Sequence, residues 1–73
     1  MNTNIWTDRG DSAAREDIRA GHTGPWDRGA VLAHLGIATE DDTDAVACGL
    51  AGDDLDTAQR AALAGYARAM EGA

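Results

Sequence analysis

Seven acidic side chains, gathered in two short segments, are the residues of this sequence whose types and spacing could do chemistry together. They are Glu40, Asp41, Asp42 and Asp44 in the first segment, and Asp53, Asp54 and Asp56 in the second. Carboxylates grouped in this way can bind calcium, attract the cationic groups of a partner, or stabilise the N-termini of helices. Each of these three roles makes a different demand on the spacing.

The spacing of the acids does not fit a calcium loop. Such a loop needs oxygen ligands at positions 1, 3 and 5, a glycine at position 6 and a glutamate at position 12. A loop that starts at Asp42 has Val46 at the fifth position, and one that starts at Asp54 has Ala58 there. Neither residue offers a side-chain oxygen, so the sequence predicts no calcium site and no other metal site.

The same spacing suits an acidic surface for a partner. On a helix, residues three apart have Cβ atoms about 5–6 Å from each other, a density of charge comparable to that of nucleic-acid phosphates. Asp41 and Asp44 are three apart, as are Asp53 and Asp56. We therefore expect the two segments to form one surface that imitates the charge of nucleic acid and occupies a basic surface of a nucleic-acid-binding protein. Phage anti-defence inhibitors of the anti-CRISPR or anti-restriction type offer an analogy of charge and size.

The net charge of −7 is unevenly distributed. Residues 1–37 carry four arginines against five acids, whereas residues 38–73 carry two arginines against eight acids, a net charge of −6. A half-chain with this charge repels nucleic acid and anionic membranes and attracts basic partners. The alternative is a small structural or regulatory helical domain, acidic because its source has a high-GC genome or lives in high salt. Salt adaptation would spread the acids widely, so the uneven distribution favours a partner surface.

The two histidines and the single cysteine do not have the spacing of a catalytic or zinc site. His22, His34 and Cys48 are separated by 12 and 14 residues, whereas zinc motifs bring ligands within a few residues of each other. We expect Cys48 to be a small core residue. A lone cysteine cannot form an internal disulfide bond, which fits a cytoplasmic protein. No enzymatic activity and no cofactor are predicted.

Residues 31–46 resemble half of a helix-turn-helix. The resemblance depends on Val31, Leu35, Gly36 and Ile37. It fails at Leu32, where the motif has a small residue, and at Asp42, where the motif has an apolar one. Lysine and arginine supply most non-specific affinity for DNA, yet acids open the second helix here. We therefore expect a simple corner between two helices and no direct binding of nucleic acid.

Caps and hydrophobic periodicity predict four helices, at about 12–20, 25–35, 40–51 and 55–71. The second would start at Pro25 and end before Gly36, and Thr39 would cap the third. Val46 and Leu50 would face the core, Gly52 would end the third helix, and Asp53 or Asp54 would cap the fourth. No segment alternates with period two, so the expected class is all-α, a compact bundle of about four short helices. No helix is predicted for residues 1–10, which we expect to form an extended N-terminal arm. A strand could form only near Ile5 and Trp6.

The chain length of 73 residues predicts a single small domain. A core of this size leaves a net stability of about 3–5 kcal/mol, so a homodimer or a partner complex would help it. No stretch approaches the roughly 18 apolar residues of a membrane span, and the first residues do not resemble a signal peptide. Trp6 and Trp26 each lie near an arginine and could anchor a partner, but so small a core needs at least one of them.

Overall fold

The structure, a computed structural model, describes residues 3–22 and 24–72. It contains four helices, namely α1 (Asn4–Arg19), α2 (Arg28–His34), α3 (Thr43–Ala47) and α4 (Gly52–Glu71). The described residues form no strand. The prediction of an all-α bundle with four helices is therefore confirmed. None of these helices is long and apolar enough to cross a membrane.

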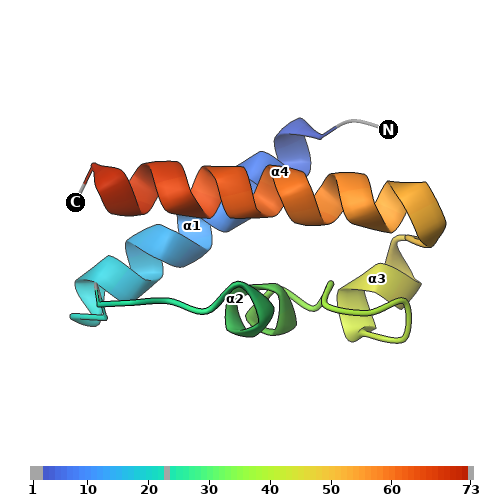
Figure 1. The fold of residues 1–73 in the computed structure, drawn as a ribbon, viewed down its shortest axis with the longest axis horizontal. Coiled ribbons are helices and arrows are strands. Elements are labelled where there is room, and N and C mark those ends of the chain that lie inside the picture. The colour runs from blue at the N-terminus through green and yellow to red at the C-terminus, as the bar shows by residue number, and fades with distance from the viewer. Residues whose placement is uncertain (1–2, 23, 73) are drawn as a thin grey trace.

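Helices α1 and α4 form the centre of the fold, and α2 and α3 lie along one side of the pair (Figure 1). The 20 residues of α4 correspond to a length of about 30 Å, close to the 32 Å longest dimension of the molecule. Helix α1 crosses α4 obliquely (Figure 1). Two glycines lie at this crossing. A Cβ atom on Gly10 would overlap the backbone carbonyl group of Ala62, and one on Gly65 would overlap that of Thr7. The two helices therefore touch backbone to backbone.

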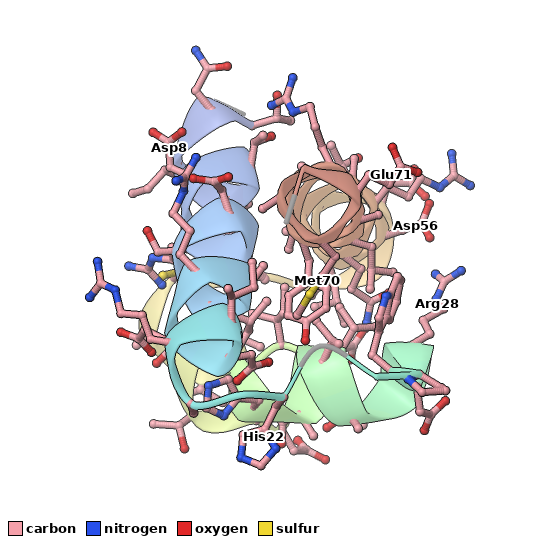
Figure 2. The ribbon with its side chains drawn as sticks, turned by 90° about the vertical axis from the view of Figure 1, so that its left-hand side faces the viewer. Asp8, His22, Arg28, Asp56, Met70 and Glu71 are labelled. Carbon is pink, nitrogen blue, oxygen red and sulfur yellow. The ribbon has the colours of Figure 1, made fainter. Side chains whose placement is uncertain are left out.

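The core consists of two clusters of buried side chains. The larger cluster contains Trp6, Leu32, Ile37, Ala45, Leu50, Leu55, Ala58 and Ala62, and the smaller contains Ala13, Ala14, Val31 and Tyr66. Leu35 and Leu63 pack against both clusters. Met70 packs against the smaller cluster and lies between α1, α2 and α4 in Figure 2. Five of these twelve buried residues are alanines. Four of them, Ala13, Ala14, Ala58 and Ala62, belong to α1 and α4, which suits the close approach of these two helices.

The first helix begins much earlier than the sequence predicts. Helix α1 starts at Asn4 rather than near residue 12, so residues 4–10 are helical and form neither an extended arm nor a strand. The reason is tertiary. Trp6 is buried in the core and Gly10 lies against α4, so this segment gains contacts that its weak local signals do not reveal. The helix ends at Arg19, and Gly21 follows with a positive φ of 84°, a conformation that is common for glycine just after a helix.

Helix α2 is shorter than predicted at its start. Asp27 has an extended backbone (φ −96°, ψ 132°) and precedes the first helical residue, Arg28. Pro25 therefore lies in the connecting segment and not at the first position of the helix. At the other end, Gly36 adopts a positive φ of 76°, which confirms its predicted place after the helix.

Helix α3 has only five residues, since it begins at Thr43 and not near residue 40, and the chain turns at Gly49 with a φ of 66°. Gly52, which was expected to end α3, instead begins α4. The eight-residue connection from Leu35 to Asp42 is longer than the three to four residues of a helix-turn-helix turn. This part of the chain is therefore not a helix-turn-helix.

The inward face of α3 differs from the predicted one. The backbone N–H groups of Asp44 and Ala45 both donate to the carbonyl oxygen of Gly36, at 3.1 and 2.9 Å. These bonds dock α3 so that Ala45 is fully buried, while Val46 is 63% exposed. Cys48 is also exposed, so its prediction as a core residue is wrong. Leu50 is buried as expected, but it lies in the connection that follows α3 and not in the helix itself.

Candidate functional site

The two acidic segments lie at the same end of the molecule, around α3 and the start of α4 (Figure 1). One hydrogen bond joins them directly. The backbone N–H of Gly52 donates to Oε1 of Glu40 at 3.1 Å. This bond satisfies one of the N–H groups at the start of α4, and it places the first segment beside Asp53. Acids that are nine to 16 residues apart in the sequence thus share one acidic end.

Two further acids of the first segment, Asp42 and Asp44, also form contacts that hold the fold. A carboxylate oxygen of Asp42 accepts hydrogen bonds from the backbone N–H groups of Ala38 and Thr39, at 2.7 and 3.2 Å. Asp44 forms a salt bridge of 3.3 Å with Arg9 of α1. Thr39 does not cap a helix that starts at residue 40, because α3 begins at Thr43. Its hydroxyl oxygen accepts instead from the backbone N–H of Asp41, at 3.3 Å.

The acids of the second segment occupy the first turns of α4. Ala51 is the residue that precedes the helix, so neither Asp53 nor Asp54 is its cap. Both lie in the first helical turn, where negative charge interacts favourably with the positive end of the helix dipole. Asp56 lies further along and forms a salt bridge of 3.1 Å with Arg60, one turn later.

Three of the seven acids have side chains that form no hydrogen bond and no salt bridge within the described part of the chain. Asp41, Asp53 and Asp54 are exposed. Across residues 3–22 and 24–72 the three salt bridges are those of Asp44, Asp56 and Asp11, so no arginine of this part of the chain pairs with these three acids. A basic group from outside could therefore approach them without displacing an internal partner.

The two tryptophans have different environments. Trp6 is only 3% exposed and belongs to the core, so it is not available as a surface anchor. Its ring is covered by the guanidinium group of Arg9, whose central carbon lies 4.5 Å from the ring centroid. Trp26 is 40% exposed and makes an edge-on contact with Tyr66, with ring centroids 5.1 Å apart. One tryptophan is thus in the core, as predicted, and the other remains accessible.

A polar contact that the sequence does not reveal lies at the opposite end of the molecule. The hydroxyl group of Tyr66 donates to Oδ2 of Asp17 at 2.5 Å and joins α4 to α1. Burial of the ring, the hydrogen bond to Asp17 and the charge of that carboxylate raise the pKa of Tyr66 to about 12. The pair lines a cavity of about 570 Å³, to which Trp26, His22 and His34 also contribute. Because Asp17 and Tyr66 are 49 residues apart, no local pattern indicates that they meet.

The described residues contain no group of three or more histidine, cysteine, aspartate or glutamate side chains that could hold a metal ion. The fold and the site define a small helical protein with an acidic end and an aromatic cavity. No protein family, curated protein or solved structure matches the chain. Function is therefore inferred from the chemistry of its surfaces.

Proposed function

We propose that this protein is a small acidic interaction module that binds a basic surface of a partner protein. The hydrogen bond between Glu40 and Gly52 is the observation that supports this most directly, because it draws the two acidic segments together. Asp41, Asp53 and Asp54 are the acids expected to contact the partner, since they are exposed and unpaired within the described part of the chain. Asp42 and Asp44 contribute negative potential while their side chains hold the fold.

A basic groove that normally holds nucleic acid is the surface that such an end would fit. The acidic half of the chain would imitate phosphate charge, steer association with the groove and exclude the nucleic acid. The protein would then act as an inhibitor or regulator, as anti-CRISPR or anti-restriction proteins of phages do. The same charge opposes direct binding of DNA or RNA by the module itself.

The test compares two triple variants that change the net charge equally. The first, Asp41→Asn with Asp53→Asn and Asp54→Asn, neutralises the acidic end. The matched control, Asp8→Asn with Glu16→Gln and Glu71→Gln, removes three exposed acids from other parts of the surface. Asp8 lies on the outer side of α1 and Glu71 on the outer side of α4 (Figure 2). Each protein is used to capture partners from a lysate at low and at physiological ionic strength, and the captured proteins are identified by mass spectrometry.

We expect wild type and control to capture the same nucleic-acid-binding protein, duplex DNA to compete for it, and the acidic-end variant to lose it. Capture should weaken as salt rises, because the Debye length falls from about 30 Å at 0.01 M to about 8 Å at 0.15 M. Equal capture by both variants would contradict the proposal, as would tight binding of the free protein to DNA. A protein that captures nothing and gains stability steeply between roughly 0.15 and 2 M salt, far beyond the screening range, would instead have a salt-adapted surface.

A further inference from the structure

The cavity of about 570 Å³ lies at the end of the molecule opposite the acidic segments. The end of α1, the connection to α2, α2 itself and the C-terminal half of α4 surround it, and Figure 2 faces this end. Asp17, His22, Trp26, Asp27, Val31 and Tyr66 are among its lining residues. The acidic interaction surface described above does not include this cavity, so its role requires a separate explanation.

The aromatic wall of the cavity is held in place but remains accessible. Tyr66 is 3% exposed, and its hydroxyl group is held by Asp17. Trp26 packs against this buried ring in a T-shaped pair, with an interplanar angle of 69°, while 40% of Trp26 stays exposed. A large indole that is supported from one side and open on the other offers its face to a ligand.

The described lining of the cavity contains two carboxylates, those of Asp17 and Asp27, and no lysine or arginine. Asp17 receives the Tyr66 hydroxyl on Oδ2, and no described group donates to its Oδ1. A carboxylate beside an accessible aromatic face favours a ligand that is both cationic and able to contact a ring.

The chain itself contains an example of this kind of recognition. The Arg9 guanidinium lies over the ring of Trp6, and it also donates to Asp44 at 3.3 Å. Indole, guanidinium and carboxylate thus form one contact set at the surface of the core. A guanidinium suits such a set better than an ammonium, because it is planar, stacks on aromatic faces and is more weakly hydrated.

We propose that the cavity binds the guanidinium group of an arginine side chain from another polypeptide, which stacks on Trp26 and donates to Asp17. This site is independent of the acidic end, and either can fail without the other. The Tyr66 hydroxyl is a positioning group that orients the Asp17 carboxylate toward the cavity. Val31 and the ring of Tyr66 provide the apolar floor for the methylene groups of the arginine.

The experiment is an NMR titration of the ¹⁵N-labelled full chain with three small probes. N-acetyl-arginine amide carries the guanidinium group. N-acetyl-citrulline amide has nearly the same shape but no charge, and N-acetyl-lysine amide has the charge but not the planar group. The indole N–H signal of Trp26 reports on the cavity, and that of buried Trp6 is the internal reference. We expect a saturable shift of the Trp26 signal by the arginine probe, with a dissociation constant on the order of 1 mM. The citrulline probe should bind about tenfold more weakly or worse, and the lysine probe about threefold more weakly.

Two variants test the assigned contacts. Asp17→Asn keeps an oxygen for the Tyr66 hydroxyl but removes the charge, and it should weaken binding of the arginine probe about fivefold. Trp26→Leu changes a partly exposed residue and should weaken binding of the arginine probe about two- to fivefold. Because this variant lacks the Trp26 indole, its binding is measured from the backbone signals of α2. Asp8→Asn makes the same change of charge at an exposed residue outside the cavity and should leave the constant unchanged. Equal binding of arginine and citrulline probes, unchanged binding in both cavity variants, or no saturable shift would each overturn the proposal.

Discussion

Gly10 of α1 faces the backbone carbonyl group of Ala62 in α4 so closely that there is no room for a Cβ atom. Gly65 of α4 has the same relationship to Thr7 of α1. The crossing of the two long helices is thus bounded by a glycine from each. This reciprocal contact brings α1 close enough to α4 for their alanines to pack, and it makes two helical glycines essential to the fold.

We expect Gly10→Ala and Gly65→Ala to destabilise the protein by about 1–3 kcal/mol or more, as overpacking of a tight contact does. Helix propensity alone predicts that both substitutions stabilise the protein, because alanine is favoured over glycine in a helix by about 1 kcal/mol. Urea denaturation followed by circular dichroism measures the difference. Gly29→Ala is the control. A Cβ there meets only Asp27 Oδ2, at 3.4 Å, so this variant should gain up to about 1 kcal/mol. Stabilisation by Gly10→Ala would show that the helices are further apart.

The two tryptophans should respond very differently to truncation. Trp6→Ala should cost about 3–5 kcal/mol, which is comparable to the whole net stability expected for a domain of this size. This variant should therefore be largely unfolded by circular dichroism at 25 °C. Trp26→Ala should lose only its edge contact with Tyr66, about 0.5–1.5 kcal/mol, and stay helical. A folded Trp6→Ala variant would be inconsistent with the 3% exposure of this side chain.

Asp42 should contribute to stability more than its acidic neighbours do. Asp42→Ala removes the acceptor for the N–H groups of Ala38 and Thr39 and should cost about 1 kcal/mol. Asp42→Asn keeps one oxygen and should cost less. Asp41→Ala should change the free energy of unfolding by less than about 0.5 kcal/mol, because that side chain is exposed. Thermal unfolding of the three variants gives the order of their stabilities. An equal loss of stability in Asp41→Ala and Asp42→Ala would contradict these roles.

The Tyr66 hydroxyl group should make stability fall at alkaline pH. Its pKa is raised from the ordinary 10.0 to about 12 in the folded state, so the unfolded chain loses this proton first. The folded state therefore binds more protons between about pH 10 and 12, and stability falls with pH across this window. Below about pH 10 the contribution is fully present.

Absorbance at 295 nm measures this titration directly, because Tyr66 is the only tyrosine of the chain. We expect a midpoint near 12 in the folded protein and near 10.0 in urea. Asp17→Asn should lower the folded midpoint, since the carboxylate helps to raise the pKa. Tyr66→Phe should show no such loss of stability with pH. A folded midpoint near 10.0 would mean that the ring is not buried beside Asp17.

Local signals predicted the helical class and several helix ends correctly. Gly21 and Gly36 follow α1 and α2 with positive φ, because glycine alone reaches that conformation without strain. The acidic character of the second half of the chain is likewise a property of composition, and no fold could remove it. The sequence does not predict the start of α1, because the burial of Trp6 and the contact of Gly10 with α4 depend on residues far away in the sequence.

Five features follow from tertiary contacts and have no local signal. The long-range contacts decide that Trp6 is buried and Trp26 accessible, that Gly10 and Gly65 form the helix crossing, and that α3 presents Ala45 rather than Val46 to the core. The acidic end exists because Glu40 reaches the N–H of Gly52, and the cavity because Tyr66 reaches Asp17. Residue types and periodicity specify which faces can be buried, but only the packed chain selects among them, since each choice depends on partners far away in the sequence.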